Sequence, residues 1–220
     1  MKRLKYVIIL LLFISMPAYA SGDIKDAKAQ YENGLMYYEG IKISKDFKEA
    51  FKWFNKAALQ GYALAQNKIG FMYENGQGIA QNYQEAIKWY KKAANSENAE
   101  SMYYLGQIYL SGKGLPKDTK EAYKWTRKAA DQGYIEAQYY LGFFYINGIE
   151  VQRDIKEAIK WWQKAADQGH VLAQYYLGMA YVKGDGVSKD FEAAKKWFTK
   201  AAEKGNVEAQ KALKEISNKK

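Results

Sequence analysis

Few side chains in this 220-residue sequence have the types and spacing that catalysis requires. His170 is the only histidine, cysteine is absent, and no cluster of acidic residues and histidine has metal-ligand spacing. Ser217 and Lys220 form a Ser-x-x-Lys pair without the companion motifs of a β-lactamase or penicillin-binding protein. Glycine pairs such as Gly76 and Gly78 lack the Lys-Ser/Thr ending of a phosphate-binding loop. The sequence therefore predicts no catalytic residue, no metal and no cofactor.

The dominant pattern is instead a repeat, in which the same landmarks return every 36 residues, the interval between Trp53 and Trp89. A fixed period of this size is typical of a solenoid, whose units contact only their neighbours and need no central core. The tripeptide Lys-Ala-Ala marks the five units at 56–58, 92–94, 128–130, 164–166 and 200–202.

Each unit reads as two helices joined by a turn, as the fourth unit illustrates. Residues 137–145 have apolar side chains at helical spacing, and Gly148 lies where a helix would end in a left-handed residue. Asp154 and Glu157 have the spacing of a capping box at the start of a second helix. Each unit is therefore predicted to be a helix–turn–helix hairpin.

Two positions carry more specific expectations. Gly142 lies inside a helix, where glycine costs about 1 kcal/mol relative to alanine, so its recurrence predicts a close approach. We expect the Ala165–Ala166 step of the paired helix to make that approach. Asn33 replaces the leucine of later units, and we expect it to soften an exposed outer face of the first unit.

The predicted fold is all-α, an α-solenoid of five 36-residue hairpins followed by a C-terminal capping helix. The expected units are residues 26–61, 62–97, 98–133, 134–169 and 170–205, with the cap at 206–220.

The first 20 residues have the layout of a secretory signal peptide, with three early cations, the apolar stretch 6–16 and Ala18-Tyr19-Ala20. We expect cleavage before Ser21 and a mature protein that is periplasmic or secreted. The alternative is a membrane anchor, but the apolar stretch is shorter than the ~20 residues that a spanning helix needs.

The net charge of +10 raises the question of anionic partners. Lysines recur four residues apart on one side of the predicted second helices, and their simplest interpretation is a solvated outer face. The alternative is weak contact of this face with anionic envelope components. Aromatic residues do not interleave there in the sequence, so no nucleic acid is predicted. The rows are Lys48/Lys52/Lys56, Lys120/Lys124/Lys128 and Lys156/Lys160/Lys164.

Several of these segments together resemble one known family. The sequences Ala-Gln-Tyr-Tyr-Leu-Gly at 137–142 and 173–178, Gly-x-Gly-Val-x-x-Asp at 184–190 and Lys-Ala-Ala-Asp-Gln-Gly at 164–169 resemble the Sel-one-like repeat, a relative of the tetratricopeptide repeat. The resemblance covers residues 26–205 and implies a right-handed superhelix that acts as an adaptor for proteins. One branch of the family is linked to β-lactams, but its repeats carry paired cysteines that this sequence lacks.

The resemblance also implies that the first helix of each hairpin lines a concave wall. Side chains that share one face of these helices would then form a partner-binding groove, unless the tyrosines serve only packing. The candidate groove residues are Tyr31, Leu35, Tyr38, Phe71, Tyr103, Tyr139, Phe143, Tyr175 and Met179.

The leading functional hypothesis is an exported, non-enzymatic scaffold that binds a protein or peptide in this groove. Two alternatives remain open at this point: an immunity or inhibitor protein that neutralises an envelope-directed toxin, and a β-lactam hydrolase or penicillin-binding protein.

Overall fold

The computed structural model describes residues 25–217, and in this range the chain forms eleven α-helices and no strand. The helices are α1 (Ala27–Glu39), α2 (Phe47–Leu59), α3 (Ala63–Asn75), α4 (Tyr83–Asn95), α5 (Ala99–Ser111), α6 (Thr119–Asp131), α7 (Ile135–Asn147), α8 (Ile155–Asp167), α9 (Val171–Lys183), α10 (Phe191–Glu203) and α11 (Val207–Ser217). The predicted signal peptide lies outside the described residues.

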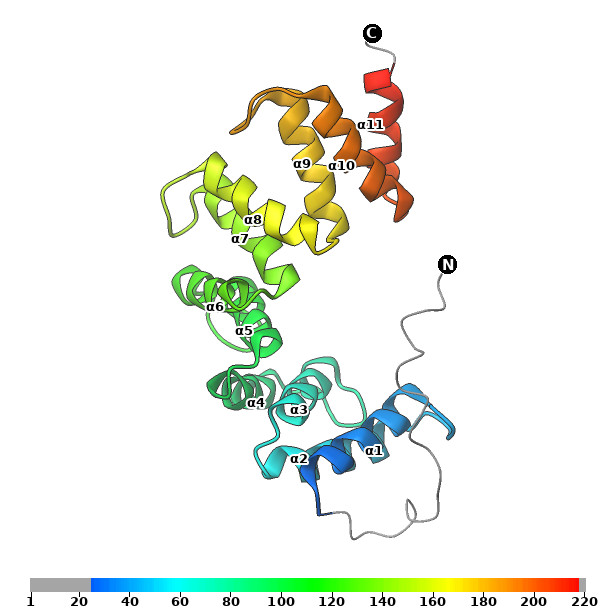
Figure 1. Cartoon of the computed structure of the whole chain (residues 1–220). Coiled ribbons are helices and arrows are strands. Elements are labelled where there is room, and N and C mark those ends of the chain that lie inside the picture. The colour runs from blue at the N-terminus through cyan, green and yellow to red at the C-terminus, as the bar shows by residue number, and fades with distance from the viewer. Residues whose placement is uncertain (1–24, 218–220) are drawn as a thin grey trace.

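The helices form five hairpins that stack into an open arc, with α3 and α5 on its inside relative to α4 and α6 (Figure 1). Each helix packs mainly on the helices that precede and follow it in the chain. Contacts are therefore local, as in other solenoids, and the arc offers a long curved surface.

The helices begin and end at the capping residues from which their bounds were predicted. The second helix of every hairpin begins after an Asp or Asn whose side chain accepts a backbone N–H; Asp154 Oδ1, for example, accepts from Glu157 N at 3.0 Å. The first helices end at glycines in the left-handed conformation, such as Gly148 with φ 64°. The bond from Glu157 N to Asp154 confirms the N-cap half of the predicted capping box. The Glu157 carboxylate instead pairs with Lys160 at 2.8 Å.

The helical glycines contact a different partner from the expected one. A Cβ added to Gly142 would meet the Trp162 indole rather than the Ala165–Ala166 step. The reason is the rotation of the second helix about its axis, which places the residue after each recurring tryptophan directly over the glycine. The same relation holds for Gly34 and Phe54, Gly70 and Tyr90, Gly106 and Thr126, and Gly178 and Phe198.

Asn33 is also placed differently from the expectation, since it is buried and only 4% exposed. It precedes Gly34 and therefore faces the paired helix, as Leu141 does in the fourth hairpin. Its Nδ2 atom has no hydrogen-bond partner within residues 25–217.

The last helix covers the end of the stack, as predicted. Ala209 is buried, and Leu213 and Ile216 pack with it against the apolar side of α10. In the described part of the chain, no helix is both long enough and apolar enough to cross a bilayer.

Candidate protein-interaction face

The candidate groove residues lie on the first helices of the hairpins, as expected, but they also belong to the core. Tyr139 is 7% exposed, and the others are partly buried against the hydrophobic clusters. The Phe143 ring lies 5.0 Å from that of Tyr139 and 5.5 Å from that of Trp162. Removing Phe143 would therefore disturb packing as well as any ligand contact.

Two sets of three rings, two repeats apart, organise the aromatic residues of these helices. The first aromatic triplet is Phe71, Tyr90 and Tyr104; the Tyr104 ring centroid lies 5.1 Å from that of Tyr90 and 5.9 Å from that of Phe71. The second aromatic triplet is Phe143, Trp162 and Tyr176. The Tyr176 ring centroid lies 5.2 Å from that of Trp162 and 5.5 Å from that of Phe143.

In each triplet the ring from the second helix is buried, and the two rings from first helices remain partly exposed. Tyr104 and Tyr176 are thus surface residues that the sequence reasoning missed. The sequence contained a sign of them, because each is the second tyrosine of a Tyr-Tyr pair whose first member was predicted to line the groove.

The third repeat interrupts the aromatic series with polar side chains. Gln107 and Thr126 occupy the positions that Phe143 and Trp162 have one repeat later. Thr126 is 1% exposed, and neither its Oγ1 nor the buried Nε2 of Gln107 has a hydrogen-bond partner among the described residues.

Carboxylates accept hydrogen bonds beside the first aromatic triplet. Asn67 Nδ2 donates to Glu100 at 2.8 Å, and the Tyr104 hydroxyl donates to the other Glu100 oxygen at 3.4 Å. The buried Tyr90 hydroxyl donates to Glu74 at 2.8 Å. Acidic groups and tyrosine rings therefore share one region of α3, α4 and α5.

Burial and these carboxylates change the acidity of the tyrosines. Burial, then the charge of Glu100, raises the pKa of Tyr31 to about 12. Burial and Glu74 raise the pKa of Tyr90 further still. These phenols therefore stay protonated at neutral pH, so they can donate hydrogen bonds but do not serve as phenolate nucleophiles.

The outer face is less available to anions than its lysines suggest. Lys160 and its equivalents Lys52, Lys88 and Lys124 pair with glutamates of the preceding turn. A second set lies over tryptophan rings, 3.8–4.8 Å from the ring centroids, which corrects the expectation that aromatic residues do not interleave there. These lysines are Lys56, Lys92, Lys128, Lys164 and Lys200.

The sequence model of the Sel1 repeat matches five consecutive segments of this chain, 27–62, 63–98, 99–134, 135–170 and 171–206. The chain belongs to the Sel1 repeat family. Among curated proteins, none matches it significantly.

Solved Sel1 repeat structures confirm the predicted α-solenoid. The protein is similar to a Sel1 repeat protein from Oxalobacter formigenes, with 37% identity, a TM-score of 0.83, and coverage of 88% of this chain and 79% of that one. It is 34% identical to c5321, a protective antigen of uropathogenic Escherichia coli, over 86% of this chain but 41% of the antigen, with a TM-score of 0.81. The immunity protein PA5088 of Pseudomonas aeruginosa is 22% identical over 88% of this chain and 69% of its own, with a TM-score of 0.56, which shows a shared fold alone.

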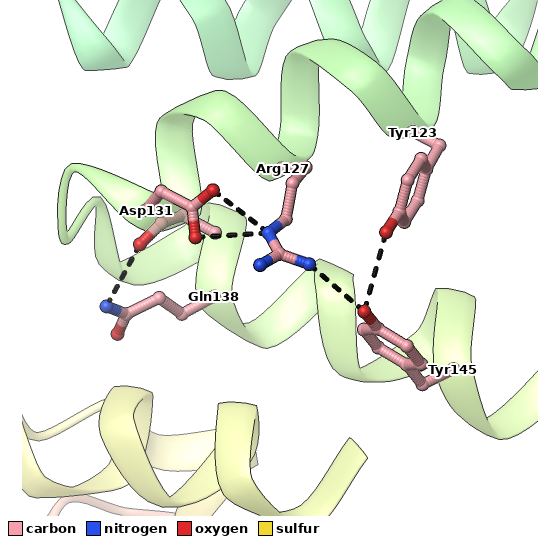
Figure 2. A network of polar contacts seen from close by, with 6 residues as sticks. Tyr123, Arg127, Asp131, Gln138 and Tyr145 are labelled. Carbon is pink, nitrogen blue, oxygen red and sulfur yellow. Dashed lines mark hydrogen bonds and ion pairs between the residues drawn. The ribbon is translucent and has the colours of Figure 1, made fainter. Parts of the chain in front are cut away.

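A polar network joins the third and fourth Sel1 repeats (Figure 2). Arg127 contacts both carboxylate oxygens of Asp131 through Nε at 2.9–3.0 Å, and its Nη1 donates to the Tyr145 hydroxyl at 3.1 Å. The guanidinium also lies 5.2 Å from the Trp161 ring centroid. Arg127 and Asp131 are partly exposed, so their ion pair adds little stability. We attribute the main effect of Arg127 to orienting Tyr145 and Trp161 across the junction between the two repeats.

The remaining candidates for chemistry make structural contacts. His170 is half-buried and caps α9, with Nδ1 accepting from Ala173 N at 3.1 Å and its ring stacked on Tyr139 at 4.3 Å. The Ser217 hydroxyl donates to the Leu213 carbonyl, and Lys220 lies outside the described residues. Between residues 25 and 217, no group of three His, Asp or Glu side chains could hold a metal ion.

His170 makes the start of the fifth repeat sensitive to acid. Burial lowers the pKa of His170 below the ordinary 6.5; the charge of Glu136 opposes this effect, and the charge of Lys204 adds to it. The neutral ring is therefore favoured in the folded state, so its stabilising effect is present above about pH 6.5 and is lost as the pH falls.

We expect acidification from pH 7.5 to pH 5 to weaken the α9 cap by about 1 kcal/mol, because protonated Nδ1 cannot accept and adds positive charge at a helix N-terminus. Urea unfolding at both pH values measures this loss. His170→Asn is the matched control, since Asn98 and Asn206 already cap α5 and α11 in the same way. A loss of equal size in His170→Asn would show that other groups cause the pH dependence.

Proposed function

We propose that this protein is an exported, non-enzymatic scaffold whose inner face holds a protein or peptide partner. Sel1 repeat proteins are protein-interaction scaffolds, and the inner face is where this chain offers a suitable surface. Export to the periplasm or beyond is supported by the signal-peptide pattern of residues 1–20.

The observation that carries the proposal is the pair of aromatic triplets. Each triplet joins two rings from neighbouring first helices to one buried ring, and the two triplets lie two repeats apart in the sequence. Partly exposed Tyr and Phe side chains held by buried neighbours are rigid, so they lose little conformational entropy when a partner binds. A segment that runs along the inside of the arc would meet both triplets. The outer face, in contrast, presents lysines that are largely engaged within the chain.

Site-specific photocrosslinking tests this proposal. With p-benzoylphenylalanine at Tyr104 or Tyr176, we expect a defined adduct in native envelope preparations, because both rings are partly exposed on first helices. The same probe at Lys156, an exposed residue of α8, should give none. Adducts from Lys156 alone would move the interaction to the outer face and contradict the proposal.

An immunity role remains the alternative, supported only by the fold shared with a protein described as an immunity protein. One-to-one binding of a purified envelope-directed toxin with nanomolar affinity, together with protection of cells from it, would favour that role.

A further inference from the structure

We propose that the inner face of the second to fourth repeats selects its partner through a lysine or arginine side chain. This inference rests on the proposed function and specifies its partner as an extended protein segment that carries positive charge. It is carried by three carboxylates, Glu74, Glu100 and Glu136, and by the tyrosine rings around them.

These carboxylates make no ion pair with a lysine or arginine of the described residues. Each is partly buried, yet none of the six ion pairs among residues 25–217 includes them. The outer glutamates differ in this respect, since Glu49, Glu85, Glu121 and Glu157 each pair with a lysine. The hydrogen bonds that Glu74 and Glu100 accept come from neutral groups and leave their negative charge in place. A cation from outside would therefore add a favourable charge interaction here.

An aromatic surface lies beside the carboxylates. Tyr104 contacts Phe71 and Tyr90, and its hydroxyl donates to Glu100. A lysine or arginine over such a ring is attracted by the negative face of the π system while its stem packs on the ring. The protein shows this arrangement beside the first aromatic triplet, where the Lys68 ammonium lies 5.9 Å from the Phe71 ring centroid and 5.5 Å from that of Tyr38.

The carboxylates of successive repeats act on one continuous stretch. After burial, Glu100 and Glu136 both raise the pKa of Tyr134, and Glu100 and Glu74 both raise that of Tyr104. The Tyr103 ring connects them, 5.3 Å from Tyr134 and 5.5 Å from Tyr104. The negative potential is therefore shared along the inner side of α3, α5 and α7.

These three carboxylates also stand out against the charge of the whole sequence, which is formally +10. A cationic segment would be repelled by the net charge of the molecule and attracted locally by these carboxylates. Charge complementarity therefore favours a basic segment, and it makes the occupant testable, because nonspecific electrostatics oppose the predicted result.

The test uses three synthetic nonapeptides of Gly and Ser in which every third residue is arginine, citrulline or glutamate. We expect isothermal titration calorimetry on the full mature chain to show binding of the arginine peptide, and at least about tenfold weaker binding of the neutral citrulline peptide. Added salt should weaken the arginine complex, and the glutamate peptide should not bind.

Variants then locate the site. Glu74→Gln/Glu100→Gln should weaken the arginine complex by about tenfold or more. Glu192→Gln/Glu203→Gln changes the net charge equally at exposed positions of α10 and should leave affinity within about twofold. Glu136→Gln is a second variant outside the hydrogen bonds of Asn67 and Tyr90, in case the first unfolds, which circular dichroism would reveal.

Equal binding of the arginine and citrulline peptides, no binding of the arginine peptide, or equal affinity for the inner-face and α10 variants would overturn the inference. If the crosslinked partner still depends on Tyr104 and Tyr176 in that case, the scaffold proposal stands and only its charge selectivity fails. If inner-face crosslinking also fails, the proposed function itself is wrong.

Discussion

Replacing Trp161 with alanine is expected to cost about 3–5 kcal/mol and to divide unfolding into two transitions. Trp161 is 3% exposed and belongs to the cluster that includes Ala122, Ala129 and Ala130 of the preceding repeat. The Arg127 guanidinium and the Lys164 ammonium lie 5.2 and 3.8 Å from its ring centroid. The side chain thus couples the third and fourth repeats, and in a solenoid such coupling is what makes unfolding cooperative.

Trp53→Ala is the matched control, because Trp53 has the same place in the first repeat and no described repeat precedes it. It is partly exposed, although Lys56 lies over its ring at 4.3 Å. We expect a loss of about 1 kcal/mol with a single transition. Urea unfolding followed by near-UV circular dichroism and hydrogen exchange measures both variants. Equal losses without separation of the two halves in Trp161→Ala would contradict the coupling.

Helix positions could be predicted from the sequence because their signals are local. Asp154 and Gly148 fix the start and end of neighbouring helices through bonds within a few residues, and the period transfers that information to all five units. The all-α solenoid and the capping helix follow from the same pattern, since hairpins this short gain stability only by stacking.

The contacts between the two helices of a hairpin could not be predicted in the same way. Gly142 was expected to meet small alanines, yet it faces Trp162, one of the two tryptophans of the paired helix. Asn33 was expected on an exposed face and is buried. Both errors have one cause, because residue spacing gives the period of a helix but not its rotation about its own axis relative to a neighbour.

The candidate site shows a similar limit. The predicted groove residues lie on the expected helices, but Tyr139 is nearly covered by packing against Phe143 and His170. The tryptophan–lysine stacks, in contrast, were available in the sequence as a Trp-x-x-Lys spacing, which places both side chains on one face of a helix. That Glu100 accepts a hydrogen bond from Asn67 of the preceding repeat and makes no ion pair within residues 25–217 could be learned only from the structure.

Gly142→Ala tests the close packing of the hairpin, and we expect it to destabilise the protein by about 1–3 kcal/mol. Helix propensity alone predicts the opposite sign, because alanine is favoured over glycine by about 1 kcal/mol. The new Cβ would collide with the Trp162 indole, which is 3% exposed and anchored by a 3.0 Å hydrogen bond from Nε1 to the Tyr139 carbonyl. The ring cannot withdraw without losing that bond.

A double-mutant cycle separates the two effects. In a Trp162→Ala background the collision is absent, so adding Gly142→Ala should stabilise the protein by up to about 1 kcal/mol, as propensity predicts. Urea unfolding of the four proteins gives the interaction free energy directly. Stabilisation by Gly142→Ala in the wild-type background would show that the indole moves aside at little cost, and that the recurring glycine is not explained by the ring above it.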